Sequence, residues 1–140
     1  MKITTIKLEG NGDFRSQESI DILKECDIVI TNPPFSLFRE YIPQMIKYNK
    51  KFLVVGNMNA ITYKEVFPLI KDGKMWAGVG FNLSMVYKSP YGNNLEANRK
   101  YVTNKGYDPD THIKVPAIAW FTNMEHNKRS EKLVLTKKYY

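Results

Sequence analysis

The amino-acid sequence predicts an α/β fold with a mainly parallel sheet in a single domain of 140 residues. Between residues 1 and 80, short runs of apolar and β-branched residues alternate with segments whose apolar residues recur at helical spacing. The links between these segments are short and rich in Gly, Asn, Asp and Pro. An order of strand, helix and strand with short links is typical of βαβ units, which form parallel sheets.

Four strands and three helices are predicted before residue 80. The strands are expected at residues 4–8, 28–31, 52–56 and 75–79, and the strand at 28–31 is expected to be buried. The helices are expected at residues 17–25 after the N-cap Ser16, from the N-cap Ser36 to about residue 48 with Pro43 inside, and from a capping box at 62–65 to about residue 71.

The pattern is looser from residue 81 to residue 110, where Asn, Gly, Pro and Tyr are frequent. We expect an extended insertion there, with a short strand at residues 83–87. Residues 116–122 predict a strand, residues 125–130 a polar turn, and residues 132–136 the antiparallel partner of that strand. The predicted sheet therefore ends in a C-terminal antiparallel hairpin.

The composition is that of an ordinary globular protein, with 43% hydrophobic and 25% charged residues. A net charge of +7 favours a polyanionic partner, nucleic acid first, although solvated lysines produce the same balance. Cys26 is interpreted as a buried, reduced thiol, and neither His112 nor His126 has partners at ligand spacing, so no metal site is expected. The sequence shows no membrane span and no signal peptide pattern, which predicts a cytoplasmic protein.

Asn32-Pro33-Pro34-Phe35, directly after the strand at 28–31, is the most informative motif. The two prolines end the strand and form a rigid turn. The exocyclic amine of adenine is a poor nucleophile because its lone pair is delocalised into the ring. The Asn32 side-chain oxygen and a carbonyl of the turn can accept its two hydrogens and localise that lone pair for attack on a methyl donor. Phe35 can stack on a base swung out of the duplex. The alternative is a tight turn without a chemical role.

A second candidate segment is Gly12-Asp13-Phe14, which follows the strand expected at residues 4–8. The Asp13 carboxylate can accept a hydrogen bond from the amino group of an adenosyl moiety, and Phe14 can flank the adenine ring. The alternative is an Asx-type turn that precedes the helix at residues 17–25.

Longer blocks carry a resemblance to a known family. They are EGNGDFRS at residues 9–16, DIVITNPPFSLFREY at 27–41, and KFLVVGN with ITYKE at 51–65, followed by Trp76 and residues 116–123. These blocks closely resemble the EcoRI-type adenine-specific DNA methyltransferases. The Asn-Pro-Pro-Phe motif alone also occurs in methyltransferases that act on RNA or on protein glutamine. The resemblance implies a partial Rossmann-like class I methyltransferase core, S-adenosylmethionine as cofactor, and double-stranded DNA with a flipped adenine as the restriction–modification substrate.

The resemblance also implies roles for single residues. In the catalytic motif of Asn32, Pro33, Pro34 and Phe35, the Asn32 side chain and the Pro33 carbonyl would polarise the target amine, and Phe35 would stack on the flipped adenine. Asp13 and Phe14 would contact the adenine of S-adenosylmethionine. Trp120 and Phe121 would help to form the wall of the target-base pocket, and packing in the core is the alternative for both.

One feature departs from the family pattern. Its members carry, upstream of these blocks, a glycine-rich loop of the Phe-x-Gly-x-Gly kind and then an acidic residue that holds the ribose, and neither is found here. The resemblance therefore implies a truncated catalytic domain over residues 1–140, corresponding to the C-terminal portion of the enzyme, with an incomplete cofactor site. Missing strands would leave a sheet edge exposed, which favours self-association or a partner chain that supplies them.

Two other classes of function remain open from the sequence. The first is a non-catalytic DNA-binding or complementation module that needs a partner chain, and the second is a methyltransferase for RNA or protein glutamine. The segments 93–95 and 100–105, with Arg99 and the rings of Tyr91, Tyr101 and Tyr107, can reach DNA phosphates and bases, or they form a solvated loop.

Overall fold

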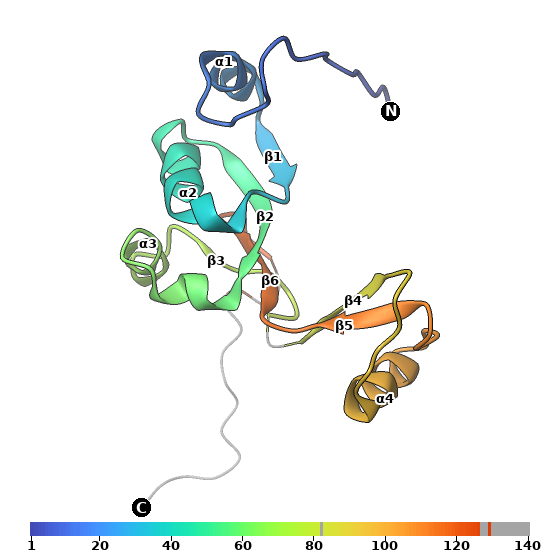
Figure 1. The fold of residues 1–140 in the computed structure, drawn as a ribbon. Coiled ribbons are helices and arrows are strands. Elements are labelled where there is room, and N and C mark those ends of the chain that lie inside the picture. The colour runs from blue at the N-terminus through green and yellow to red at the C-terminus, as the bar shows by residue number, and fades with distance from the viewer. Residues whose placement is uncertain (82, 127–128, 130–140) are drawn as a thin grey trace, which may run out of the picture.

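A computed structural model of the chain describes residues 1–81, 83–126 and 129 (Figure 1). Its helices are α1 (Gln17–Glu25), α2 (Phe38–Lys47), α3 (Phe67–Lys71) and α4 (Glu96–Asn104), with 3-10 turns at η1 (Phe35–Leu37) and η2 (Met58–Thr62). The strands are β1 (Ile28–Thr31), β2 (Lys51–Asn57), β3 (Trp76–Ala77), β4 (Met85–Lys88), β5 (His112–Val115) and β6 (Ile118–Thr122). None of the described helices is long and apolar enough to cross a bilayer.

Within the described residues, the main sheet has the strand order β1-β2-β6-β3. β1 and β2 are parallel, whereas β6 lies between β2 and β3 and is antiparallel to both. Three strands therefore run in one direction and β6 runs against them, so the fold is α/β with a mixed sheet. The strand expected at residues 132–136 as the partner of β6 lies outside the described residues.

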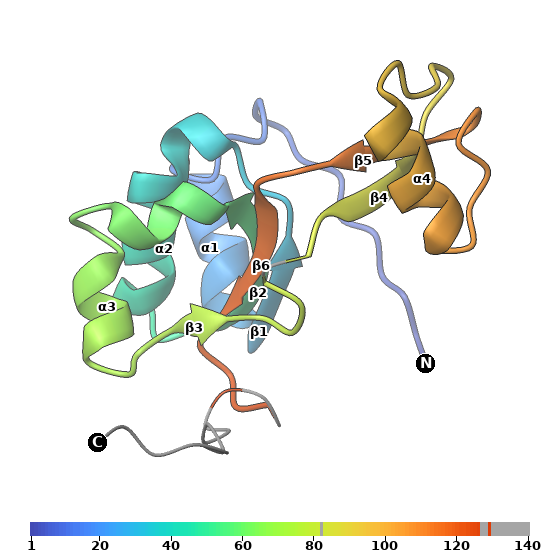
Figure 2. The same cartoon turned by 90° about the horizontal axis from the view of Figure 1, so that it is seen from below.

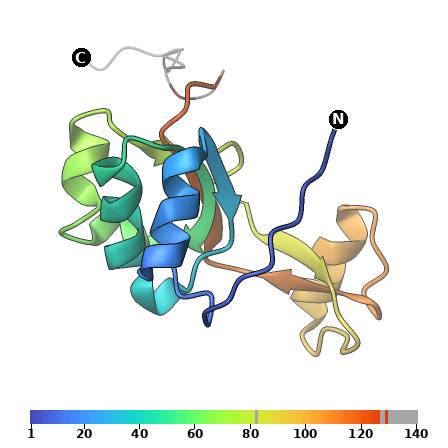
Figure 3. The same ribbon diagram turned by 90° about the horizontal axis from the view of Figure 1, so that it is seen from above.

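The core lies on one face of this sheet. Alternate residues of β2 and β6 point to that face, and Phe52, Val54 and Phe121 are completely buried there. Helix α2 covers them with Phe38 and Ile42, which are also fully buried. Helices α1, α2 and α3 all lie on this side of the sheet (Figures 2 and 3). The apolar spacing along α2 thus fixes which face of the helix meets the sheet.

The prediction that β1 is buried was wrong. Ile28 is 48% exposed and Ile30 is 67% exposed, because β1 is an edge strand and these two side chains point away from the helices. Val29 points the other way and packs against the core. A run of apolar residues therefore identified the strand but not its position in the sheet.

Both N-caps expected after β1 were wrong, whereas Ser16 does cap α1 by accepting from the Ser19 amide. Ser36 lies inside η1, and α2 begins at Phe38, directly after this 3-10 turn. Thr62 ends η2, where its hydroxyl donates to the Asn59 carbonyl, and α3 begins only at Phe67. At the first site a 3-10 turn occupies the expected start of the helix, and at the second residues 63–66 form turns before α3 begins.

Residues 4–8, expected as a strand, are extended but form no strand among the described residues, and Ile6 is 59% exposed. An alternating segment needs a neighbouring strand for its backbone hydrogen bonds, and the described sheet offers none beside it. The strand expected at 75–79 is confirmed only at β3, and the one expected at 83–87 is displaced by one or two residues to β4.

A separate unit occupies the region expected to be an extended insertion. β4 and β5 form an antiparallel ribbon that α4 covers, and the unit stands off from the main sheet (Figure 2). The Asn93 side chain stabilises this unit by donating hydrogen bonds to the Pro109 and His112 carbonyls at 3.1 and 2.6 Å. Helix α4 was not predicted from the sequence, because Val102 is its one buried residue and no side chain caps its start. With so little apolar periodicity, the sequence carries no helix signal there.

A test of the core concerns Gly56 of β2, where an added Cβ would lie 2.7 Å from the Phe38 ring and 3.1 Å from that of Phe121. Gly56→Ala is expected to lower the free energy of unfolding by about 1–3 kcal/mol through overpacking, as measured by urea denaturation. In a double-mutant cycle, Phe38→Leu should cost less in the Gly56→Ala background than in the native protein, and strict additivity would contradict this packing.

Candidate functional site

A cavity of about 490 Å³ lies at the carboxyl end of β1. It brings together the two segments that the sequence analysis singled out, residues 11–14 and the turn after β1. Its lining residues are Asn11, Gly12, Asp13, Phe14, Thr31, Asn32, Pro33, Pro34, Leu37 and Tyr41. Five of the six predicted site residues thus surround one space, although Asn32 comes eighteen positions after Phe14 in the chain. Phe35 is the exception, since it is half-buried in η1 beside the cavity and does not line it.

The turn after β1 holds Asn32 in an exposed position on a rigid support. Asn32 is exposed, whereas Pro33 behind it is buried. Pro34 has φ −60° and ψ 123°, and its carbonyl accepts from the Leu37 amide at 3.1 Å to close the η1 turn. Because proline fixes φ and cannot donate to the ladder, β1 must stop here and the chain passes directly into η1. The amide side chain of Asn32 is therefore presented at the sheet edge with little backbone freedom.

Asp13 is held by its neighbour Arg15. The carboxylate accepts from the Arg15 backbone amide and Nε through Oδ1, at 2.8 and 3.0 Å, and from Nη2 through Oδ2 at 2.9 Å. These hydrogen bonds lower the pKa of Asp13 to about 2. They occupy three of the roughly four acceptor positions of a carboxylate, so one position on Oδ2 is left for a ligand. Asp13 is therefore an ionised acceptor of fixed orientation.

Helix α2 holds the segment 13–15 against the turn. Arg15 Nη1 donates to Glu40 at 3.0 Å, and the Gln44 amide donates to the Phe14 carbonyl at 2.9 Å. The Phe14 ring meets the Tyr41 ring edge-on, with 5.0 Å between centroids. Burial raises the pKa of Tyr41 to about 12, so its hydroxyl stays protonated at neutral pH. The helix that follows the turn therefore also positions the second half of the cavity.

The sequence did not single out these supporting residues. Leu37, Glu40, Tyr41 and Gln44 fall within the helix expected from Ser36 to about residue 48, with no further role indicated. A usable signal was the spacing of Tyr41 and Gln44, which puts both on one face of α2. The partner of that face lies 27 to 30 residues earlier in the chain, and helical periodicity does not reveal such a partner.

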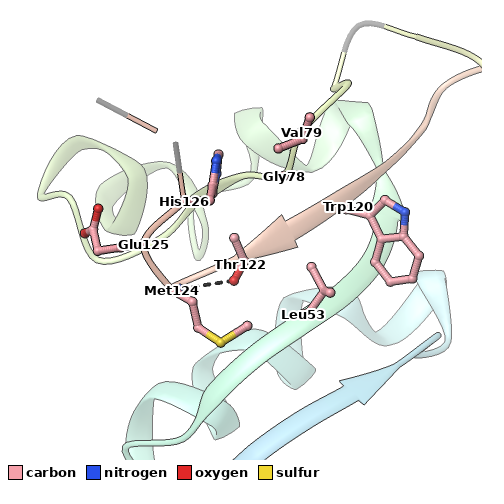
Figure 4. Close-up of a pocket in the computed structure, with 8 residues that line it drawn as sticks. All are labelled: Leu53, Gly78, Val79, Trp120, Thr122, Met124, Glu125 and His126. Carbon is pink, nitrogen blue, oxygen red and sulfur yellow. Dashed lines mark hydrogen bonds between the residues drawn. The ribbon is translucent and has the colours of Figure 1, made fainter. Parts of the chain in front are cut away.

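Trp120 and Phe121 do not line this cavity. Phe121 is fully buried in the core, where its ring packs against those of Phe38 and Phe81 at 5.5 and 5.7 Å. Trp120 points to the opposite face of the sheet, where it borders a different pocket with Leu53 and Val79 (Figure 4). The described residues also include no cluster of three or more His, Cys, Asp or Glu side chains that could hold a metal ion.

The chain is similar in sequence to a known family of methyltransferases. Residues 1–140 match the family described as adenine-specific methyltransferase EcoRI. The chain belongs to this family. Among curated proteins, the chain is similar to the type II methyltransferase M.EcoRI of Escherichia coli, with 49% identity over 138 residues. M.MgeORF184P of Mycoplasma genitalium and M.MpnI of Mycoplasma pneumoniae, also named type II methyltransferases, are 42% and 38% identical over 125 and 143 residues.

The matches cover most of this chain but a minor part of each relative. They span 94%, 88% and 99% of the chain, and 40%, 38% and 43% of M.EcoRI, M.MgeORF184P and M.MpnI. The chain thus spans about two fifths of the length of the EcoRI-family methyltransferases that it matches. No solved structure matches it significantly.

Methyltransferases of this kind imply S-adenosylmethionine, and the cavity fits one half of that molecule. A volume of about 490 Å³ is within the range of about 300–1,000 Å³ for small-molecule pockets. The open acceptor position on Asp13 suits an exocyclic amine, and Phe14 provides an apolar ring beside it. These groups match an adenine ring and not the charged ammonium and carboxylate groups of a methionine.

The Arg15 contacts generate a test by titration. Arg15→Gln is expected to raise the pKa of Asp13 from about 2 towards its usual value of 3.8, because the charged donors to the carboxylate are lost. Since the folded pKa is the lower one, the pair stabilises the fold above about pH 3.8, and this stabilisation disappears as the pH falls towards 2. Carboxyl carbon chemical shifts measure the titration. Arg99→Gln, which breaks the ion pair with Asp110, is the control and should leave Asp13 unchanged.

Proposed function

We propose that the chain provides the target-base half of an S-adenosylmethionine-dependent methyltransferase that modifies the exocyclic amino group of adenine in DNA, in restriction–modification. The observation that carries the proposal is the shared cavity of Asn32 and Asp13 at the carboxyl end of β1. Ligands of open α/β sheets bind at this edge. Membership of the EcoRI methyltransferase family supports both the reaction and the base.

The turn after β1 supplies the hydrogen-bond acceptors for the target amine. The Asn32 side-chain oxygen accepts one hydrogen of the amine, and the Pro33 carbonyl accepts the other. Two acceptors in fixed positions draw the nitrogen towards tetrahedral geometry and direct its lone pair. Because Pro33 is buried and Pro34 is tied into η1, the acceptors keep their spacing as the base arrives. Phe35, beside the cavity, stacks on the flipped adenine.

Asp13 and Phe14 hold the adenine ring of the cofactor on the other side of the cavity. The free lone pair of Asp13 Oδ2 accepts from the adenine amine, and the Phe14 ring flanks the base. S-adenosylmethionine supplies an electrophilic methyl group on its sulfonium when it is bound. We expect groups outside the matched part of the relatives to hold its methionine half.

Double-stranded DNA is the substrate class that the charge favours, with a net charge of +7. β6 begins at Ile118 opposite Asn57, the last residue of β2, so the β4–α4–β5 unit joins the main sheet at the edge where Asn32 lies. This unit carries the exposed rings of Tyr91 and Tyr107 and the exposed Lys100. A duplex with its adenine in the cavity would pass this unit, and the reaction would take place in the cytoplasm, where the DNA of the bacterial relatives lies.

A second candidate is a complementation module that binds DNA without transferring a methyl group alone. The observation that favours it is the short span of the match, which covers 40% of M.EcoRI. Methyl transfer to RNA or to protein glutamine is a third candidate function, since the hydrogen-bond acceptors at Asn32 and Pro33 suit any planar NH2 group. Methyl-transfer assays on DNA, RNA and protein substrates separate these functions.

Asn32 provides the direct test of the chemistry. In a chimera in which residues 1–140 replace the matched segment of M.EcoRI, Asn32→Ala is expected to reduce methyl transfer to double-stranded DNA by roughly 100- to 1,000-fold, because one acceptor of the target amine is lost. Transfer of a labelled methyl group is the measurement, and the affinity for the cofactor should not change. Asp72→Asn, at the C-cap of α3 and away from the cavity lining, is the control. Full activity of the Asn32 variant would refute the assigned role.

Calorimetry tests the division of the cofactor site. The chain on its own is expected to bind adenosine and S-adenosylmethionine with similar, weak affinity, because its residues contact only the adenosyl half. Asp13→Asn should weaken both equally, since the amide replaces a charged acceptor by a weaker one. If the chain alone binds S-adenosylmethionine tightly and adenosine does not compete, the proposed half-site is wrong.

A further inference from the structure

Tyr41 of α2 lines the cavity that Asp13 and Asn32 share. Its side chain is 6% exposed, and it borders the cavity together with Leu37, one helical turn earlier. Long side chains of a helix lean back towards the helix N-terminus, so the Tyr41 ring extends from α2 towards the turn after β1. The ring also meets the Phe14 ring edge-on, with 5.0 Å between centroids. Tyr41 therefore lies where the two segments of the candidate site come together.

The Tyr41 hydroxyl has no hydrogen-bond partner in the described part of the chain. Desolvation alone raises the pKa of this group, and no hydrogen bond or neighbouring charge contributes. Among the described residues, Glu65 Oε2 is the enclosed side-chain oxygen without a partner, so the unpaired Tyr41 oxygen is not sealed off and is open to the cavity. A largely buried hydroxyl without a partner is unfavourable, and a ligand that accepts its hydrogen removes this penalty.

Packing alone does not account for this hydroxyl. A phenylalanine at position 41 would fill the same space and would keep the edge-on contact with Phe14. It would also avoid the cost of taking a hydroxyl out of water. The polar atom at this position therefore points to a ligand and not to the core.

The hydroxyl complements the carboxylate of Asp13. Asp13 is ionised and can only accept a hydrogen bond, whereas the Tyr41 hydroxyl is protonated at neutral pH and is free to donate one. Asp13 directly precedes Phe14, whose ring contacts Tyr41, so the acceptor and the donor lie on adjoining walls of one cavity. Adenine has the matching pattern, because the ring nitrogens N1 and N7, which accept, flank its amino group, which donates.

We propose that the Tyr41 hydroxyl donates a hydrogen bond to the cofactor adenine, at one of the two ring nitrogens beside the amino group, and that Tyr41 is a specificity-determining residue of the cofactor site. The inference rests on the proposed function, because it takes the ligand of Asp13 to be an adenosyl group. A single hydrogen bond to Asp13 would leave the ring free to turn about that bond. A second one of opposite direction, from Tyr41, fixes the orientation of the ring beside Phe14.

Calorimetry of the 140-residue chain with adenosine, 1-deazaadenosine and 7-deazaadenosine tests this hydrogen bond. Each analogue carries a CH group in place of one ring nitrogen, so the native chain should bind one of them about 5- to 10-fold more weakly than adenosine. Tyr41→Phe should weaken the binding of adenosine by the same factor and should bind adenosine and that analogue equally. Tyr48→Phe is the matched control, since it removes a hydroxyl at the C-cap of the same helix, away from the cavity lining.

Urea denaturation without ligand gives a second readout. Tyr41→Phe should not lower the free energy of unfolding, because the hydroxyl has no partner in the described chain, and a clear loss of stability would overturn the inference. It would also be overturned if Tyr41→Phe changed the affinities for adenosine and both analogues equally, or changed none of them. If the native chain binds adenosine in that last case, the inference fails and the proposed function stands. If the native chain binds neither adenosine nor S-adenosylmethionine, the proposed cofactor site itself is wrong, and the role of Tyr41 with it.

Discussion

The packing of α2 on the main sheet positions everything at the candidate site. Phe38, the first residue of the helix, fits against Gly56 of β2 and fixes where the turn after β1 must end. One turn further, Tyr41 and Gln44 hold Phe14, and Glu40 holds Arg15. A single helix thus sets the distance between Asn32 and Asp13. Groups that must act on one reacting centre are best held by one rigid element, since small displacements are costly.

The sequence was sufficient to predict those elements that depend only on neighbouring residues. Ser16 and the apolar positions of α1 predicted that helix with its observed bounds, because a cap and a periodic face are both properties of neighbouring residues. The same holds for the strand residues of β1 and β2 and for the rigid turn of prolines between β1 and α2. The motifs at residues 12–14 and 32–35 were each recognised from local sequence, and both line the same cavity although the strand expected before the first of them is not formed.

The sequence was not sufficient to predict the position of an element that depends on contacts with a segment distant in the chain. An apolar strand looks the same at the edge and in the centre of a sheet, so Ile28 and Ile30 were placed in the interior. β6 was expected at the margin with a later partner, yet it lies between β2 and β3, and its direction follows from a connection through an entire additional unit. That unit is stabilised by the polar contacts of Asn93 and by Val102, not by an apolar stripe. The spacing of apolar residues along the sequence does not reveal such contacts.

The way in which Arg15 occupies Asp13 has a consequence for the choice of nucleobase. A carboxylate that is ionised at every physiological pH can accept a hydrogen bond but can never donate one. A purine with an amino group at position 6 satisfies it. A purine with a carbonyl group there, as in inosine or guanosine, would set two acceptors against each other in a space already bounded by the Phe14 ring. In the proposed cofactor site, the salt bridge between Arg15 and Asp13 would thereby also select adenine over purines with a 6-oxo group.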